Sequence, residues 1–313
     1  SPNSVYQVIY INEDFVRVEG IELDLSGVTN ANTISGIDTS NSLGMTSDIR
    51  IDAVIIHDIT NVDSTNAGYI GAISLNAGNI RVTNSIIYNL ENNDLSYANA
   101  EGMWLDGGTN SKSYIYNNTI YNIVDNDDPG DGYTGGIVVE DGAVEITNNA
   151  VLNVTAASGY CYNAGTLEGY NVASDDSGDI NNMTDYEDYF ISVTPGSEDF
   201  HLKATDTVLR NAGTSLSSDT GYAFASDIDN AGRIEDLWDI GADEASRRVY
   251  YSVGTSTADL KTAANVTITS GVAELSAAQT NNNIGVGDKL IAGGNTYYNS
   301  GRTDSDTYSV ITA

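Results

Sequence analysis

The stretch of the sequence that is most suggestive of chemistry is DNDDPGDG, residues 125–132. Alternating carboxylates beside a glycine turn offer the oxygen ligands that Ca²⁺ prefers in proteins. The stretch has no glutamate at the twelfth position of an EF-hand loop, so a solvated acidic loop is the alternative interpretation. The expected calcium ligands are Asp125, Asp127, Asp128 and Asp131.

Three arginines recur at one position of a long repeat and offer a second kind of chemistry. Arg17, Arg50 and Arg81 are separated by 33 and 31 residues, so a repeating fold would stack them in one column. A column of guanidinium groups would bind an acidic glycan or a sulfate. The alternative is a solvated face on which the arginines pair with Glu19 and Asp52.

Aromatic residues suggest a carbohydrate platform, since Tyr88 and Tyr121 share one repeat position and Trp104 lies between them in the sequence. Aromatic residues stacked on a sheet face would equally well only stabilise that sheet. His57 and His201 are far apart and have no metal-ligand spacing. The sequence shows no Ser-His-Asp elbow, no P-loop and no Rossmann fingerprint, so no catalytic residue is assigned.

A repeat of about 32 residues is the element that must position these side chains. With Val18, Ile51, Val82, Ile115 and Ile146 as anchors, the spacings are 33, 31, 33 and 31 residues. A second apolar segment that ends in glycine recurs with the same period, in residues 72–78, 102–108 and 136–142. Short apolar segments at such a period predict an all-β solenoid with one coil per repeat.

Asparagines recur at two positions of the repeat, although asparagine is depleted in strands. In a solenoid they would stack about 4.8 Å apart at corners, where asparagine tolerates the left-handed backbone and each side-chain amide bonds to the next. These predicted structural ladders are Asn84, Asn117 and Asn148, and Asn89, Asn122 and Asn153. Aliphatic residues five positions after the anchor are expected to form an inward stack: Ile56, Ile87, Ile120 and Val151.

Over about residues 5–172, repeats such as ITNNAVLNV resemble those of right-handed parallel β-helix proteins of the pectate-lyase-like type. The resemblance implies the right-handed coil, and it speaks to fold rather than to function. Enzymes of this type use a lysine or arginine base with calcium, or an aspartate cluster with GHG and RIK elements. Neither the GHG nor the RIK element occurs here.

The second half of the chain differs in pattern. DFHL, NAG, DIDNAGR and DIGADE resemble the closing tail of extracellular β-helix proteins, and we expect residues 173–246 to cover the open end of the solenoid. Arg233 is expected to pair with Asp227 or Asp239. Residues 247–313 predict a separate small β-sandwich or barrel-like module with a hairpin at Gly293 and Gly294, after a β-helix in residues 1–246.

Composition restricts the function classes. With 44 acidic and 12 basic residues the net charge is −32, which disfavours nucleic acid as a partner. The sequence contains no run of about 20 apolar residues, so membrane insertion is not predicted. The single cysteine, Cys161, is expected to be buried.

Three interpretations remain: a non-catalytic extracellular or cell-surface structural protein, a β-helix polysaccharide lyase or glycoside hydrolase, and a glycan-binding adhesin. An open first coil would also favour head-to-tail self-association into a fibre, with the 247–313 module of a neighbouring copy as its cover. The alternative is that a further part of a longer chain covers this coil.

Overall fold

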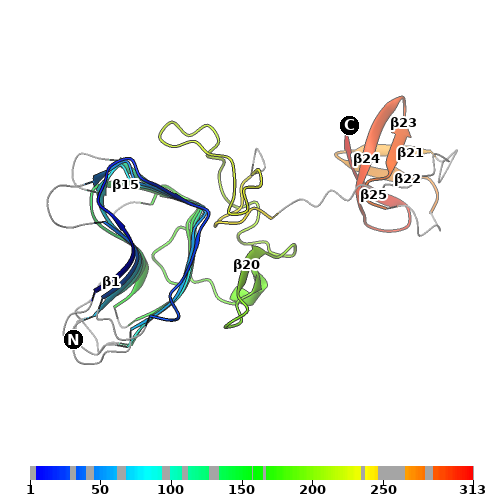
Figure 1. The fold of residues 1–313 in the computed structure, drawn as a ribbon. Helices are drawn as coiled ribbons and strands as arrows, with labels where there is room; N and C mark the ends of the chain where they lie inside the picture. Colours follow the sequence, from blue (N-terminus) through cyan, green and yellow to red (C-terminus); the bar gives the residue numbers. More distant parts are fainter. Residues whose placement is uncertain are drawn as a thin grey trace. The chain divides into compact units, whose positions relative to one another are not determined.

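The computed structural model divides the chain into two compact units, Ser1–Ala245 and Ser246–Ala313 (Figure 1). The structure describes residues 5–28, 33–39, 46–61, 68–93, 99–107, 112–126, 134–156, 158–164, 167–233, 237–245, 265–278 and 285–312. No helix among these residues is long and apolar enough to cross a membrane.

The first unit is a parallel β-solenoid whose complete coils each add one strand to three sheets (Figure 1). Sheet A contains β1 (Val5–Ile11), β4 (Thr33–Thr39), β8 (Tyr69–Gly78), β11 (Asn99–Asp106), β14 (Gly135–Asp141) and β17 (Tyr160–Asn163), and β5 (Thr46–Ser47) also pairs with β8. Sheet B contains β2 (Arg17–Glu19), β6 (Arg50–Asp52), β9 (Arg81–Thr83), β12 (Lys112–Tyr116) and β15 (Ala143–Thr147). Sheet C contains β3 (Glu22–Asp24), β7 (Ile55–Asn61), β10 (Ile86–Asn92), β13 (Thr119–Asp125), β16 (Ala150–Thr155) and β18 (Val172–Ala173). The predicted fold class is confirmed.

The strand register follows the repeat. The predicted anchors are paired in one column of sheet B, from Val18 and Ile51 through to Ile146. The predicted inward stack is paired in sheet C, where Ile56, Ile87, Ile120 and Val151 are completely buried. A one-residue slip would turn these aliphatic side chains outward, so their burial fixes the register of every coil.

Sheet A bends, and its outer face is concave (Figure 1). The strands of sheet A carry small residues where neighbouring backbones approach closely. A Cβ on Gly36 would lie 2.6 Å from the Ala72 carbonyl oxygen, and one on Gly102 would lie 2.6 Å from that of Gly136. The glycines that end the aligned segments are thus accompanied by glycines that this close approach requires.

The asparagine positions are corners. All six predicted ladder residues have left-handed backbones with φ between 49° and 60°. Asn148 donates to Asn117 Oδ1 over 3.1 Å, and Asn153 donates to Asn122 over 3.0 Å. Asn122 in turn donates to Asn89 over 2.9 Å. These three bonds link copies in neighbouring coils while the backbone makes the turn. The predicted link between Asn84 and Asn117 is replaced, because Asn117 donates to the Asp239 and Gly241 carbonyls of the tail and Asn84 donates to Asp52.

A third asparagine ladder lies inside the solenoid and was not predicted. Asn118 donates to Asn149 over 3.0 Å, and Asn149 donates to Asn171 over 3.1 Å. All three residues are completely buried, and their amides also bond to backbone carbonyls. The NN pairs of the repeat thus have separate tasks, since the first residue turns the corner and the second fills the core beneath it.

The acidic stretch of residues 174–179 closes the last coil of the solenoid. The Asp175 carboxylate accepts the backbone N–H of Cys161 over 2.7 Å, and Ser177 accepts that of Tyr162 over 2.9 Å. These donors lie on the edge strand β17, which has no further strand beyond it. Side chains thus satisfy an edge that another strand would otherwise pair. Cys161 is buried as expected, and burial raises the pKa of its thiol to about 11.

Most of the tail covers the side of the solenoid, which corrects the prediction that it covers the open end. The tail contains η1 (Tyr186–Asp188), β19 (Phe190–Ser192) and β20 (Asp199–Leu202). It buries apolar side chains against the outer face of sheet C. The tail contributes Phe190, Phe200, Leu209 and Ile240, and the sheet contributes Ile86, Tyr121 and Leu152. The aromatic and aliphatic residues of the tail pack on this sheet face. Their positions in the sequence did not predict that contact.

Arg233 is buried and pairs with Glu244 over 3.3 Å, not with Asp227 or Asp239 as predicted. Asp227 and Asp239 are occupied by backbone N–H groups of the tail's own turns. The side chain of Arg233 also donates to Asn84 Oδ1 over 2.8 Å, at a corner of the solenoid. Arg233 therefore connects the DIGADE turn to the repeat.

The second unit is an antiparallel half-barrel sheet with the strand order β21-β22-β25-β24-β23. Its strands are β21 (Val266–Thr269), β22 (Val272–Leu275), β23 (Lys289–Ala292), β24 (Asn295–Arg302) and β25 (Thr307–Thr312). The predicted hairpin is present, because Ala292 pairs with Asn295 across Gly293 and Gly294, which have φ of 57° and 83°. Two successive positive φ values are what a two-residue hairpin turn needs.

Candidate functional site

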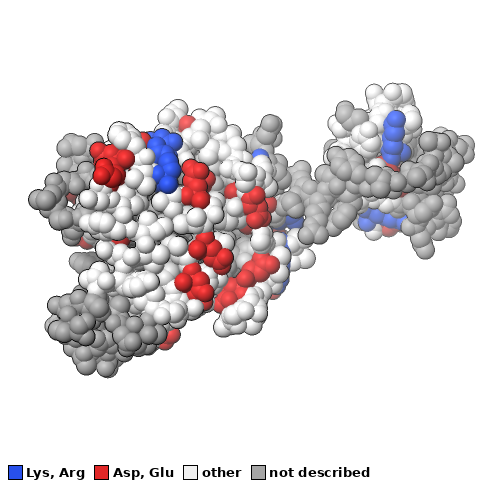
Figure 2. Space-filling model, in the orientation of Figure 1, with Lys and Arg blue, Asp and Glu red and all other residues white. Residues whose placement is uncertain are grey.

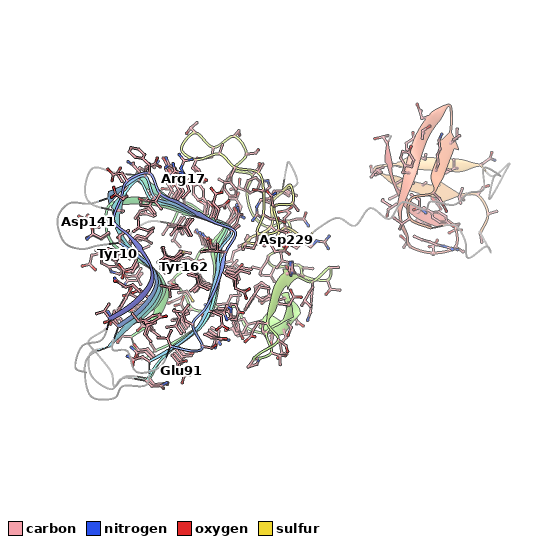
Figure 3. All side chains as sticks on the ribbon, viewed as in Figure 1. Tyr10, Arg17, Glu91, Asp141, Tyr162 and Asp229 are labelled. Carbon is pink, nitrogen blue, oxygen red and sulfur yellow. The ribbon has the colours of Figure 1, made fainter. Side chains whose placement is uncertain are left out.

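The three arginines of the repeat lie in one column on the outer face of sheet B. Arg17 is paired in register with Arg50, and Arg50 with Arg81. Figure 2 shows basic side chains gathered on this part of the solenoid between groups of acidic ones, and Arg17 is labelled there in Figure 3.

One carboxylate holds the column together. Asp48 lies 2.9 Å from Arg17, 3.3 Å from Arg50 and 2.6 Å from Arg81. Its backbone is left-handed, with φ of 59°, which places it at the corner just before sheet B. The predicted pairing of the arginines with Glu19 and Asp52 is therefore wrong, although Glu19 and Asp52 also lie in sheet B. Asp52 instead accepts hydrogen bonds from Thr83 and Asn84.

Aromatic rings border the column. The Tyr222 ring, from the tail, lies 5.7 Å from the guanidinium of Arg50 and 5.3 Å from that of Arg81. The Tyr114 ring lies 5.8 Å from the guanidinium of Arg81. The Nε of Arg81 is buried without a hydrogen-bond partner among the described residues. Three cations share one carboxylate here, so the column retains capacity for an anionic ligand.

The aromatic residues suggested as a carbohydrate platform do not form one surface. Tyr121 is only 8% exposed, because the tail covers it with Tyr186 and Phe200. Tyr88 packs on Phe200 in the same sheet C. Trp104 belongs to β11 in sheet A, on another face. The structural alternative, in which the tyrosines stabilise a sheet face, describes Tyr88 and Tyr121.

The predicted calcium loop is described only at its start. Asp125 ends β13, is buried, and accepts a hydrogen bond from the Thr134 hydroxyl. Asp127, Asp128 and Asp131 lie outside the described residues. Calcium binding at this loop stays a prediction. The Asp125 carboxylate already accepts a hydrogen bond from Thr134, just before the next strand of the chain.

A buried acid on the concave face of sheet A escaped sequence analysis. Glu101 is 1% exposed, and its register neighbours in adjacent coils are Gly71 and Gly135. Its neighbour Ala100 belongs to the core, and a Cβ on Gly102 would meet the core residue Ile120, so Glu101 projects from the opposite face of the strand. The Tyr69 hydroxyl covers this column, since a Cβ on Gly71 would overlap it.

The environment of Glu101 favours its protonated form. Burial raises the pKa of Glu101 to about 8, the neighbouring Tyr69 partly opposes this shift, and Glu140 adds to it. One carboxyl oxygen has no hydrogen-bond partner among the described residues. A carboxylic acid that is protonated at neutral pH can serve as a proton donor in catalysis, but here Tyr69 separates it from solvent.

No protein-family model matches the chain, and no curated protein matches it. The likeness of its repeat and of its DIGADE segment to β-helix proteins therefore remains a resemblance between those residues.

Proposed function

We propose that this chain is a non-catalytic extracellular or cell-surface β-solenoid protein that binds an acidic polysaccharide along sheet B. The observation that carries the proposal is the column formed by Arg17, Arg50 and Arg81 on a chain with a net charge of −32. The parallel coils repeat the guanidinium groups along one line at about 4.8 Å per coil. A linear polyanion is the ligand class that can contact several of them at once.

A second candidate function is cleavage of a polysaccharide by an enzyme of the pectate-lyase-like β-helix type. It is favoured by one observation, the raised pKa of Glu101 on the concave face of sheet A. Its side chain is almost inaccessible to solvent, and Tyr69 would have to move before a substrate could reach it. Binding without cleavage therefore agrees better with the geometry.

The test is binding of the full chain to a sulfated glycan such as heparin, to a uronate polymer and to neutral dextran. Titration calorimetry at about 0.15 M salt reduces long-range repulsion, since the Debye length is then about 8 Å. We expect binding to at least one of the two acidic polymers, with affinity lowered about three- to tenfold by Arg17→Gln or by Arg50→Gln. The same mixtures are assayed for new reducing ends and for unsaturated products.

Lys289→Gln is the matched control, because it removes one exposed positive charge from the second unit. Equal losses in this control and in Arg50→Gln would show that only net charge matters and would contradict a site on sheet B. Release of products by the wild-type protein, but not by Glu101→Gln, would favour the enzyme instead.

Self-association into a head-to-tail fibre is proposed as the structural side of this function. Strands β1, β2 and β3 each end their sheet, so each has one neighbour among the described strands. Strand β1 carries exposed apolar side chains, with Val5 59% and Tyr10 49% exposed. An exposed apolar edge favours strand addition from a second copy.

We expect negative-stain electron microscopy of concentrated full-length protein to show filaments, and Tyr10→Lys to shorten them, because a charge on an edge strand opposes pairing. A chain that ends at Glu244 separates the contribution of the second unit from that of the solenoid edge. Monodisperse monomers at high concentration would contradict the fibre.

A further inference from the structure

His57 lies on the outer face of sheet C beside the part that the tail covers. It stands in register between Asp24 of the first coil and Tyr88 of the third. Its ring is parallel to the Tyr88 ring within 1°, with 4.8 Å between the centroids. His57 is 7% exposed, so stacking holds the imidazole in one orientation.

Carboxylates flank both nitrogens of this imidazole. Nδ1 lies 3.1 Å from an Asp58 carboxylate oxygen, and Nε2 lies 3.2 Å from one of Glu22. A neutral imidazole has a single N–H, so one of these contacts joins a nitrogen lone pair to a carboxylate oxygen. Either a second proton on the ring or a metal ion between the nitrogen and the oxygen would remove that conflict.

A set of possible metal ligands already converges at this place. One ligand atom from each of Asp24, His57 and Asp58 lies within 4.8 Å of the others. Each carboxylate is oriented by a second bond: Asn89 donates to Asp58 over 3.0 Å, and the Ser26 N–H donates to Asp24 over 2.9 Å. Such outer partners are typical of metal sites, because they aim the remaining oxygen at the ion.

We propose that His57, Asp24 and Asp58 bind a divalent transition-metal ion of the Zn²⁺ type. Glu22, 3.2 Å from Nε2 of His57, would hold the second ring nitrogen. An imidazole nitrogen with carboxylate oxygens suits Zn²⁺, whereas Ca²⁺ takes oxygen ligands only. The spacing of possible ligand residues around each histidine in the sequence had predicted no metal site. The ligands come together because Asp24 and His57 occupy the same position in neighbouring coils.

The bound ion would join the first coil to the second. Asp24 belongs to β3, the last strand of sheet C, whose residues are exposed or half-buried. His57 and Asp58 belong to β7, which is largely buried. A metal bridge between them would stabilise the first coil, whose strand β3 is exposed or half-buried, since the free energy of metal binding adds to that of folding.

Within the described part of the chain, His201 is the centre of the other such group, with Asp229 and Asp243. It is a weaker candidate, because the side chain of His201 is 47% exposed, whereas His57 is buried and stacked on Tyr88. The nitrogens of His201 lie 2.5 Å from Asp199 and 2.9 Å from Asp229. Burial lowers the pKa of His201, but the hydrogen bonds that its ring donates to Asp199 and Asp229 outweigh this effect and raise the pKa to about 9. A metal would have to displace that proton.

The experiment titrates chelator-stripped full-length protein with Zn²⁺ by calorimetry and with Co²⁺ by visible absorption. We expect one site that depends on His57, together with a rise in Tm on adding Zn²⁺. Asp24→Asn and His57→Gln should each weaken metal binding at least tenfold. His57→Gln should also abolish the visible absorption band of Co²⁺ that arises from its coordination by the imidazole nitrogen. His201→Gln is the matched control and should bind as the wild type does.

Three outcomes would overturn the proposal: no binding of either ion by the wild type, unchanged binding by His57→Gln, or loss of binding in His201→Gln alone. Circular dichroism of each metal-free variant checks folding. Asp24 is exposed, so if His57→Gln does not fold, Asp24→Asn decides the matter.

Discussion

Replacing Glu101 with glutamine is expected to raise the free energy of unfolding at neutral pH by about 3 kcal/mol. The pKa of Glu101 lies at about 8 in the folded chain against an ordinary value of 4.5, chiefly because the carboxyl is buried. Each unit of difference corresponds to about 1.4 kcal/mol, and about 2.5 units of it are expressed at pH 7. Glutamine keeps the shape of the protonated acid and has no charge to lose.

The size of this effect depends on pH in a defined direction. Because the folded pKa lies above the unfolded one, Glu101 contributes stability that is fully present below about pH 4.5. That contribution is lost as the pH rises through about 8. The wild type and Glu101→Gln should therefore be similar near pH 4.5 and should differ by about 4–5 kcal/mol above pH 8.

Urea denaturation of both proteins at about pH 5, 7 and 9 measures this difference. Glu19→Gln is the control, since it neutralises an exposed carboxylate of the same solenoid. A stability difference that is the same at all three pH values would show that packing, not ionisation, distinguishes glutamine from glutamate at this position.

The repeat was predictable because one strand register places every copy of a residue in the same environment. Five anchors at spacings of 31 or 33 residues sufficed for the sheet B register, and Asn89, Asn122 and Asn153 marked a corner. Each of these inferences uses a pattern that recurs in several coils. A single coil would have been ambiguous, since short apolar segments fit strands and helices alike.

Features that occur once were not predictable. The left-handed corner before sheet B recurs at Phe15, Asp48 and Asn79, but only Asp48 carries a carboxylate that can hold three arginines. Glu101 is buried because Tyr69 and two glycines surround it. The tail residues that cover sheet C follow no repeat. Their partners depend on tertiary packing, on which local spacing carries no information.

Arg233 makes the strongest link between this tail and the repeat. Its side chain is completely buried, and that of Glu244 is 2% exposed. It donates to the carbonyls of Gly241 and Ala242 over 3.1 Å and 2.9 Å, and to Asn84 in the solenoid over 2.8 Å. Burial lowers the pKa of Arg233, and Glu244 opposes that shift. The arginine is thus a buried cation whose hydrogen bonds join three segments.

Arg233→Met is expected to destabilise the first unit by about 3–5 kcal/mol, because it leaves Glu244 buried without its positive partner. The loss should be concentrated in the tail, since the ladders and the aliphatic core of the solenoid do not depend on Arg233. Hydrogen exchange should therefore rise in β19 and β20 more than in β10 or β13. Exposure of Phe190 and Phe200 should also increase binding of a hydrophobic dye.

Two further variants separate charge from packing. Arg210→Met removes an arginine whose guanidinium donates to the Ala204 carbonyl over 2.7 Å in the tail, and the change should cost less than about 1 kcal/mol. The double variant Arg233→Met with Glu244→Gln should recover part of the loss, because the uncompensated charge is gone. If the double variant is less stable than Arg233→Met alone, the hydrogen bonds of Glu244 to the backbone, such as that from the Asp239 N–H at 2.9 Å, matter more than its charge.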